Sequence, residues 1–388
     1  MDAKSPTKEL NRMLLTVYLN FYIDNQLLNI YNSVYVHGII CRAKKRTKKN
    51  IFIRRVIRIA STIKDIAVVC GVSPGTVDRA LNNRGGINED TKNKIMQVAK
   101  ELDFQPNHLA RCLVTGTTNT IGVVCINISY SFFSLLIEEI EKIAKENGYF
   151  ITLILTHNDL QREIEGIQYL TRRKVDGLII FPVGIGTEYE HKLKTLNVPI
   201  VTLYNRISPD FVHVDVDCRK IMRNAVAFIV RKGYSRVIYL NNGFQNLGIK
   251  GLNSYSLDEK RIGYLEGIKE ENLKENRIVE GFDPGTLLRL IEDGKDEKAA
   301  ILCFNDHLAI RVLDLFRQRG IIVPEQAGIM GFDNIDILNV ISPRIQSVDC
   351  EIRYLGREAF SILLRQINKD SNVHDCIGGY SFTEGETL

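Results

Sequence analysis

The chain has 388 residues, of which 45% are hydrophobic and 25% are charged. This composition is typical of a folded globular protein and excludes a largely disordered one, and the length allows two or three domains. The net charge of +5 is concentrated in residues 1–60, which carry 12 Lys and Arg against 3 Asp and Glu, whereas residues 61–388 carry 39 against 43. The charge of the whole chain is therefore weak evidence for nucleic-acid binding.

The cysteines and the apolar segments limit the type of protein further. The eight cysteines are scattered, and none forms a Cys-x-x-Cys pair. Because a zinc cluster needs closely spaced ligand pairs, we expect no metal site, and free thiols fit the reducing cytoplasm. The longest apolar segment, residues 13–28, is interrupted by four polar side chains, so it predicts neither a membrane span nor a signal peptide.

Residues 1–60 have no counterpart later in the chain. Residues 42–58 hold nine basic residues and no acidic one, which is typical of a nucleic-acid-binding arm. The same composition fits an unstructured extension, or a segment translated from upstream of the true start. The sequence leaves these alternatives open.

Residues 61–106 predict three short helices. Thr62 is a good N-cap residue for the first helix, and Gly71 permits the positive φ of a tight turn after it. Ser73 caps the second helix, Pro74 is tolerated in its first turn, and apolar residues at helical spacing mark the third. Two short helices across a glycine turn, with a third packed behind them, form a helix-turn-helix.

From Thr120 onward, apolar runs alternate with amphipathic segments. The runs expected to be strands are 121–126, 150–155, 177–181, 200–204, 237–240, 299–304 and 328–332. The expected helices include 132–147, 161–173, 219–232 and 307–319. Continuous apolar strands that alternate with helices indicate buried parallel sheets, here two doubly wound lobes. A ligand then binds at the carboxyl ends of the strands, in the cleft between the lobes.

A series of short motifs follows this organisation. The head motifs are TIKDIA at 62–67, GVSPGTVDRALN at 71–82, FQPN at 104–107, LARCL at 109–113 and TIG at 120–122. The core motifs are VDGLI at 175–179, VPIV at 198–201, FNDHLA at 304–309, VPE at 323–325 and GFD at 331–333. In order and spacing, from residue 61 to about residue 370, the chain resembles LacI/GalR-type bacterial transcriptional regulators, the lactose and purine repressor family.

The resemblance implies an all-α helix-turn-helix head and an α/β, two-lobed core like a periplasmic binding protein, with two doubly wound parallel sheets. The implied domains are a basic extension (1–60), the head (61–106), a hinge (107–118) and an effector-binding and dimerisation domain (119–388). The implied function is a sequence-specific repressor whose affinity for double-stranded operator DNA is controlled by a small carbohydrate-like effector. The hinge mechanism implies a homodimer without a membrane partner, and a tetramer stays open.

The second helix of such a head enters the major groove with its N-terminal residues at the base edges. Arg79 is the expected base reader because a guanidinium pairs bidentately with guanine, whereas Pro74 and Gly75 offer only shape or methyl contacts. Asp78 stands where the family commonly has Ser; it accepts from a cytosine amino group, pairs with Arg79 or Arg84, or has no role. The short polar residues expected at phosphates are Thr62, Ser73, Thr76 and Asn82.

In the hinge, the resemblance implies DNA contacts by Asn107, Ala110, Arg111 and Leu113. Leu113 matches the leucine that inserts between the central base pairs of the operator, which unstacks a base step and bends the duplex. A leucine at this place also fits the packing of a linker turn. We favour insertion because the surrounding hinge motifs are in place.

The expected effector-binding residues lie where strands end or helices begin: Asn127, Phe132, Phe133, Asn205, Arg206, Lys260, Arg261 and Asp306. The resemblance implies a ligand-binding carboxylate at Asp306, and either Lys260 or Arg261 in place of the family's ligand-binding Arg. It also implies an aromatic pair at Phe132 and Phe133, with one ring expected on the ligand and one in the core. Amides such as that of Asn205 both accept and donate, which suits a hydroxylated ligand.

Two other classes of function fit the sequence less well. A cytoplasmic sugar-binding receptor without DNA function fits the core, but it leaves the head unexplained. An enzyme would need a nucleotide-binding loop, a metal cluster or a nucleophile constellation, and GIGTEY at 184–189 lacks the third glycine of such a loop. We therefore predict neither enzymatic activity nor a cofactor. Salt-dependent binding to a short pseudo-palindrome separates a repressor from both alternatives.

Overall fold

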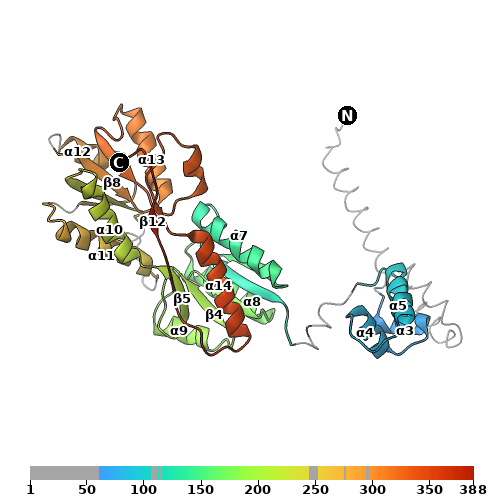
Figure 1. Ribbon diagram of the computed structural model, residues 1–388. Helices are drawn as coiled ribbons and strands as arrows, with labels where there is room; N and C mark the ends of the chain where they lie inside the picture. Colours follow the sequence, from blue (N-terminus) through green and yellow to red (C-terminus); the bar gives the residue numbers. More distant parts are fainter. Residues whose placement is uncertain (1–60, 106–111, 113–115, 244–251, 275–276, 294–296) are drawn as a thin grey trace, which may run out of the picture. The chain divides into compact units, whose positions relative to one another are not determined.

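The computed structural model describes residues 61–105, 112, 116–243, 252–274, 277–293 and 297–388. The chain divides into two compact units between Arg111 and Cys112, and each unit is described by itself (Figure 1). The expected extension, residues 1–60, lies outside the described residues. None of the described helices is both long and apolar enough to cross a membrane.

The described part of the first unit folds into three helices, α3 (Ile63–Cys70), α4 (Pro74–Leu81) and α5 (Glu89–Glu101). A capping box starts α3: the Thr62 hydroxyl accepts from the Asp65 N–H, and the Asp65 carboxylate accepts from the Thr62 N–H. Gly71 ends α3 at φ +70°, a left-handed conformation that glycine adopts without strain. The Ser73 hydroxyl caps α4 by accepting from the Thr76 N–H.

The three helices of the head share one small core. Ile66, Val77 and Ile95, one from each helix, are completely buried in it. Burial of each such side chain contributes about 1.5–3 kcal/mol. The predicted helix-turn-helix is therefore present, with its second helix packed through one face only.

The second unit contains two parallel sheets, one in each lobe. The sheet of lobe one has the order β11-β5-β4-β3-β1-β2. Its strands are β1 (Thr120–Cys125), β2 (Phe150–Leu155), β3 (Gly177–Ile180), β4 (Ile200–Leu203), β5 (Val212–Val216) and β11 (Cys376–Gly378). The helices that cover it are α7 (Ser131–Glu146) and α14 (Ile352–Ile367) on one face, and α8 (Leu160–Arg172) and α9 (Thr187–Lys194) on the other. Along β1, Val123 faces the first pair of helices and Val124 the second, as the strand's period of two requires.

Lobe two has the same layered design with a smaller sheet, in the order β7-β6-β8-β9. Its strands are β6 (Arg236–Asn241), β7 (Arg277–Glu280), β8 (Ala299–Cys303) and β9 (Ala327–Met330). The helices are α10 (Cys218–Arg231) and α11 (Tyr255–Glu270) on one face, and α12 (Pro284–Glu292) and α13 (Asp306–Gln318) on the other. The 3₁₀ helix η2 (Asp336–Val340) follows β9.

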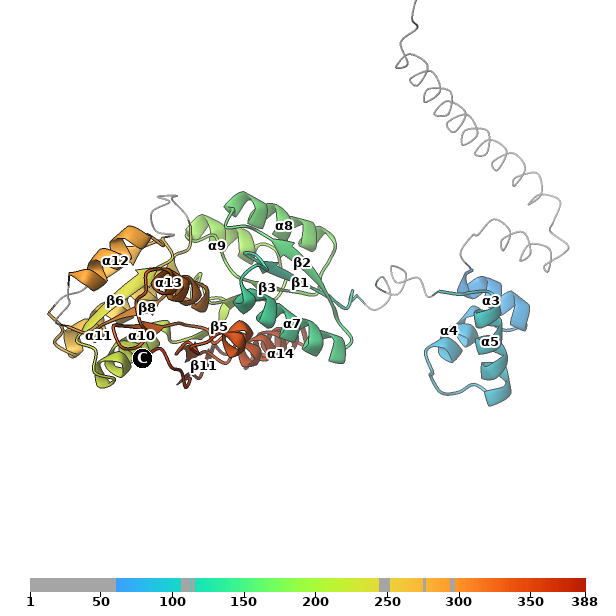
Figure 2. The same cartoon turned by 90° about the horizontal axis from the view of Figure 1, so that it is seen from above.

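The chain crosses between the lobes more than once, so neither lobe is continuous in sequence. It passes from β5 to α10, returns through β10 (Val348–Asp349) to α14, and crosses again at β12 (Ser381–Phe382), which pairs antiparallel with β10. Figure 2 shows the lobes side by side within the second unit. Every described pair within the two larger sheets is parallel. The predicted two-lobed α/β core is confirmed.

Candidate DNA-binding surface and effector cavity

The second helix of the head presents a polar face to solvent. Val77 and Ala80 of α4 are buried, whereas Ser73, Pro74, Gly75, Arg79 and Asn82 are exposed, and Thr76 is half-buried. The Arg79 guanidinium forms no ion pair within the described part of the chain. The contact of Arg79 with a base edge, expected from the sequence, stays a prediction.

The Asp78 carboxylate has two partners within the head, Asn82 and Arg84. It accepts a hydrogen bond from Asn82 Nδ2 at 2.9 Å and lies 3.5 Å from the Arg84 guanidinium. Of the roles considered for Asp78, the pairing with Arg84 is the one present in this structure. These contacts also reduce the repulsion that a bare carboxylate would exert on a nearby phosphate.

Most of the expected hinge, including Asn107, Ala110, Arg111 and Leu113, lies outside the described residues. The chain that enters β1 is described again from Gly116, and it is tied to lobe one at Thr118. The Thr118 N–H donates to the Asp176 carboxylate at 2.8 Å, and the Thr118 hydroxyl donates to the Lys174 carbonyl. These hydrogen bonds fix the backbone just before β1 to the segment just before β3.

A cavity of about 180 Å³ lies between the two lobes. Its walls come from the carboxyl ends of β1, β2, β3, β4, β6, β8 and β9, the place where parallel sheets bind ligands. The polar lining residues are Asn127, Asn158, Asn205, Asn242, Asn253, Ser256, Lys260, Asn305, His307 and Asp333, and the aromatic ones are Tyr130, Phe132, Phe133, Phe181, Tyr204 and Phe304. No group of His, Cys, Asp or Glu among the described residues is placed to hold a metal ion.

Five of the eight residues predicted to bind the effector line this cavity: Asn127, Phe132, Phe133, Asn205 and Lys260. The ring of Phe132 is nearly buried and packs 4.5 Å from the ring of Tyr204. Phe133 is less buried and packs 5.1 Å from Phe181. Of this pair, Phe133 is thus the ring better placed to meet a ligand.

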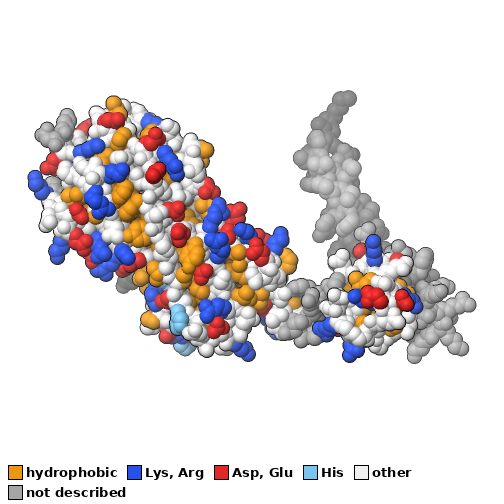
Figure 3. Space-filling model, in the orientation of Figure 1, with side chains coloured by type: hydrophobic (Ala, Val, Ile, Leu, Met, Phe, Trp, Pro, Cys, Tyr) orange, Lys and Arg blue, Asp and Glu red, His pale blue; other side chains and the backbone are white. Residues whose placement is uncertain are grey.

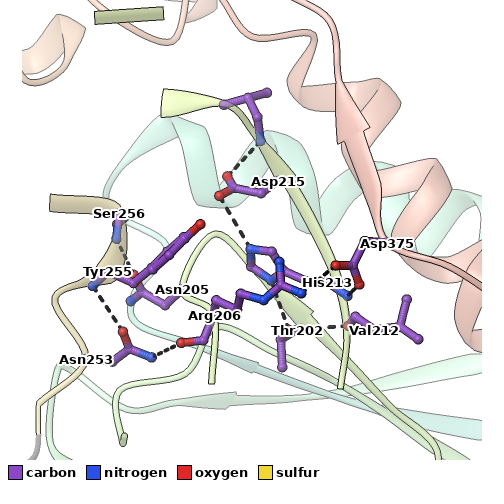
Figure 4. Close-up of polar contacts among 11 residues, drawn as sticks. Thr202, Asn205, Arg206, Val212, His213, Asp215, Asn253, Tyr255, Ser256 and Asp375 are labelled. Atoms are coloured by element: carbon purple, nitrogen blue, oxygen red, sulfur yellow. Dashed lines mark hydrogen bonds and ion pairs between the residues drawn. The ribbon is translucent and has the colours of Figure 1, made fainter. Parts of the chain in front are cut away.

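Asn205 joins the two lobes beside the cavity (Figure 4). Its Nδ2 donates to the carbonyl of Pro182 in lobe one, and its Oδ1 accepts from the N–H of Ser256 at the start of α11. Asn253 repeats this pattern, because its Nδ2 donates to the carbonyl of Arg206. The amides of this wall therefore hold the lobes together as well as facing the cavity.

Arg206 is not part of the lining. Its guanidinium donates to Asp375 Oδ2 at 2.7 Å, and the other oxygen of Asp375 accepts from the backbone N–H of His213 (Figure 4). The buried His213 ring lies between the Thr202 hydroxyl and the Asp215 carboxylate. Arg206 thus links the loop after β4 to Asp375, the residue directly before β11.

Arg261 and Asp306 also lie away from the lining. Arg261 is 3.6 Å from the Glu280 carboxylate. Asp306 is completely buried, and its two oxygens accept from the Ser347 hydroxyl at 2.5 Å and the Ile335 N–H at 2.9 Å. Burial raises the pKa of the Asp306 carboxyl well above its usual range. Asp306 thus orders the loop after β9.

Lys260, rather than its neighbour Arg261, faces the cavity. Its Nζ donates to the Phe304 carbonyl at 3.0 Å and lies 3.5 Å from the centre of the Phe332 ring and 4.1 Å from that of Phe304. Only 3% of the residue is exposed. The carbonyl and the two ring faces compensate for the lost hydration of the ammonium group.

The sequence reasoning missed seven polar lining residues: Asn158, Asn242, Asn253, Ser256, Asn305, His307 and Asp333. A usable signal existed for some of them, because Asn158, Asn242 and Asn305 follow β2, β6 and β8 within a few residues. Asn253 and Ser256 gave no such signal, since their place at the cavity depends on how α11 docks on lobe one. Burial raises the pKa of Asp333 to about 7 and lowers that of His307 below its usual value.

Comparison with known proteins agrees with both parts of this description. Residues 62–107 match the family of bacterial regulatory proteins, lacI family, and residues 226–378 match the periplasmic binding protein-like domain. The chain is 31% identical over 314 residues to the HTH-type transcriptional regulator RegA of Clostridium acetobutylicum, covering 80% of this chain and 94% of RegA. It is 29% identical over 329 residues to the HTH-type transcriptional repressor PurR of Vibrio vulnificus, covering 81% and 94%.

Two solved structures share the fold. The lac repressor dimer bound to operator and the anti-inducer ONPF matches with a TM-score of 0.73 at 18% identity, covering 85% of this chain and 99% of that chain. A periplasmic binding protein/LacI transcriptional regulator from Alkaliphilus metalliredigens, complexed with D-xylulofuranose, matches with a TM-score of 0.59 at 24% identity, covering 70% and 99%. The chain described here therefore belongs to the lacI family of bacterial regulatory proteins: it is a DNA-binding, ligand-controlled regulator of transcription and not an enzyme.

Proposed function

We propose that this regulator is a homodimeric repressor that acts in the cytoplasm, without a membrane partner, on a pseudo-palindromic operator. Its effector is a small, neutral, hydroxylated molecule, a sugar or sugar derivative, held between the lobes. The observation that carries this effector class is the cavity lining, in which amides and aromatic rings outnumber charged groups. Amides pair with hydroxyls as donors and as acceptors, and ring faces suit the apolar face of a sugar.

Several of the lining groups have hydrogen-bonding capacity to spare. Asn127 and Asn305 use their Oδ1 atoms to accept from backbone N–H groups at the starts of helices. Within the described residues, their Nδ2 groups have no acceptor, and the Asn158 side chain forms no hydrogen bond. A ligand with several hydroxyls would satisfy these groups, and the D-xylulofuranose in the Alkaliphilus relative is a molecule of this kind.

The homodimer has two supports. The lac repressor relative binds its operator as a dimer, and two heads that read equal half-sites require a two-fold arrangement. The second unit also exposes large hydrophobic side chains, among them Val340 at 78% and Phe150 at 71%. Figure 3 shows hydrophobic patches between charged groups on the visible face of this unit.

The proposed control is a shift between lobe arrangements. An effector favours the arrangement to which it binds more tightly, and it can shift the equilibrium only by that difference in affinity. Because Thr118 ties the hinge to Asp176, a change in lobe one alters where the two hinges of a dimer begin. The two heads of the dimer then gain or lose the spacing that the two operator half-sites require.

Selection from a random double-stranded DNA pool, followed by binding of the selected sequence at several salt concentrations, tests this function. A repressor of this kind selects a short pseudo-palindrome, and its affinity falls steeply as salt rises. Sedimentation of the complex should show two protomers bound to each operator duplex. A protein that binds sugars but selects no DNA sequence would instead be a receptor without DNA function.

A further inference from the structure

Gly75 is a glycine that the fold of the head does not require. It lies in the first turn of α4, so no left-handed backbone conformation calls for a glycine there. A Cβ at this position would have Ser73 Oγ at 3.8 Å as its nearest neighbour, which is an ordinary van der Waals contact. Because glycine destabilises a helix relative to alanine, the residue is better explained by a close approach of its backbone to another molecule.

The molecule that this part of the chain meets is DNA, because residues 62–107 match the lacI family of regulatory proteins. Gly75 and Arg79 are exposed, and residues four apart lie on one face of a helix. Val77 and Ala80 are buried on the opposite face. Helical side chains lean towards the N-terminus, so the long side chain of Arg79 extends towards the turn in which Gly75 presents bare backbone.

The polar side chains on either side of Gly75 are engaged within the head. The hydroxyls of Ser73 and Thr76 lie 2.9 Å apart, and Ser73 Oγ also accepts from the Thr76 N–H. The Asp78 carboxylate accepts from Asn82 Nδ2. What remains in front of the first turn of α4 is the exposed ring of Pro74 beside the bare backbone of Gly75. We call this surface, formed by Pro74 and Gly75, the apolar notch.

The apolar notch fits only one feature of a base edge. It has no hydrogen-bonding side chain, and Pro74 also lacks a backbone N–H, so it is poorly suited to the donors and acceptors of the bases or to a phosphate. The apolar group that a base pair presents in the major groove is the C5 methyl of thymine. A thymine methyl is therefore the group that this surface can recognise.

We infer that Gly75 determines operator specificity through its missing side chain, because the apolar notch receives the C5 methyl of a thymine. This inference rests on the proposed function, since it names a base pair of the proposed operator. Gly75 and Arg79 are about 6 Å apart along the helix axis, which corresponds to about two base-pair steps. The thymine is thus expected within about two base pairs of the guanine that Arg79 is predicted to read.

A methyl group at position 75 would occupy the space that the thymine methyl needs. Gly75→Ala should therefore lower the affinity for the operator while leaving the head folded, because an added methyl group in a close-packed contact forces the surfaces apart. Uracil is thymine without the C5 methyl, so an operator that carries uracil makes room for the alanine. Moving the methyl group from the DNA to the protein should restore binding.

This exchange of methyl groups is the test. The full chain is first used to select an operator, and each thymine of the half-site is then replaced by uracil in both half-sites. Fluorescence anisotropy should show one thymine whose replacement weakens binding of the parent chain about tenfold, the worth of two buried methyl groups. Gly75→Ala should bind the thymine operator about tenfold or more weakly than the parent chain does, and should prefer the uracil operator.

Asn93→Ala is the control variant. Asn93 is exposed on α5, and alanine there also improves helix propensity, so this variant gains stability without any change on α4. It should keep the parent's affinity and its preference for thymine. Hydrogen exchange of the head amides shows whether Gly75→Ala is folded, and protection at least equal to the parent's is expected.

The outcomes separate the inference from the proposed function. If no thymine responds in the parent chain, or if Gly75→Ala still prefers the thymine operator, the role of Gly75 is wrong and the proposed function stands. If Gly75→Ala loses the same affinity for the selected and a scrambled duplex, its backbone approaches phosphates, and the inference is also wrong. If the chain selects no DNA sequence, the proposed function fails and the inference fails with it. The uracil series on the parent chain decides the matter should Gly75→Ala not fold.

Discussion

The imidazole of His307 in lobe two accepts a hydrogen bond from the backbone N–H of Ser131 in lobe one, at 3.4 Å from Nε2. The ring also packs edge-on against Tyr130, with 5.2 Å between the ring centres. Ser131 begins α7, and His307, which lies in the first turn of α13, also lines the cavity. It is a direct link between the two lobes.

Replacing His307 should therefore loosen the closed arrangement. His307→Ala removes one hydrogen bond, worth about 0.5–1.5 kcal/mol, and should weaken the binding of a neutral sugar by about 2- to 10-fold. His191→Ala, at an exposed position of α9, is the matched control. Calorimetry should show weaker sugar binding for His307→Ala than for His191→Ala. Equal sugar affinities of the two variants would show that the His307–Ser131 contact does not support ligand binding.

The same contact predicts a dependence on acid pH. Only a neutral ring can accept from the Ser131 N–H, and burial lowers the pKa of His307 in the closed form below its ordinary value of 6.5. The stabilisation is thus complete above about pH 6.5 and declines as the pH falls and the open form takes up a proton. Sugar affinity measured from pH 7 down to pH 5 should fall more in the parent chain than in His307→Ala.

Arg79 should carry base discrimination. Arg79→Ala is expected to narrow the difference in affinity between the selected operator and a scrambled duplex by about 1–3 kcal/mol. Arg84→Ala is the control, because Arg84 is also exposed but pairs with Asp78. Competition between the two duplexes, followed by fluorescence anisotropy, compares the two variants. If Arg79→Ala loses the same affinity for the selected and the scrambled duplex, Arg79 contacts phosphates rather than a base.

Two glycines of the head should respond in opposite directions. Gly71 has φ +70° and no atom near a potential Cβ, so Gly71→Ala costs about 1–2 kcal/mol through backbone strain alone. Gly75 lies in α4, with its nearest atom 3.8 Å from a potential Cβ, so Gly75→Ala should stabilise by about 0.5–1 kcal/mol. Hydrogen exchange of the head amides in the full chain reports both changes, and identical protection in the two variants would contradict the turn geometry.

Glu163 should be a stability residue of lobe one. Its buried carboxylate accepts from the N–H groups of Val183 and Gly184 and from the Tyr189 hydroxyl at 2.6 Å. Glu163→Ala leaves three buried donors without an acceptor and should destabilise the second unit by about 3 kcal/mol. Denaturant unfolding is the measurement, with Glu165→Ala at an exposed position of the same helix as control. Similar midpoints for both variants would contradict this role.

The sequence predicted the elements whose apolar pattern is local, and it missed those that depend on distant partners. Continuous runs such as β8 were recognisable, whereas β5 alternates apolar residues with His213 and Asp215 and escaped recognition. The choice between Lys260 and Arg261 depends on how α11 is rotated against β8, which no local pattern contains. Asp306 faces Ser347, a residue 41 positions away, and only the folded chain reveals that it is satisfied there.

Asp333 lines the cavity but was not among the residues predicted to bind the effector. It follows β9 with φ +108°, and its backbone N–H donates to the Val348 carbonyl. Its position depends on this contact with the distant strand β10, which a sequence pattern does not encode. The predicted contacts of Asn107, Ala110, Arg111 and Leu113 stay predictions, because those residues lie outside the described part of the chain.

The most direct test of the account joins the two halves of the protein in one measurement. The full chain is titrated onto its selected operator, followed by fluorescence anisotropy, with and without a saturating neutral sugar that binds the cavity. The sugar should change operator affinity by at least fivefold in the parent chain, which is a coupling of about 1 kcal/mol. An operator affinity that is the same with and without bound sugar would contradict it.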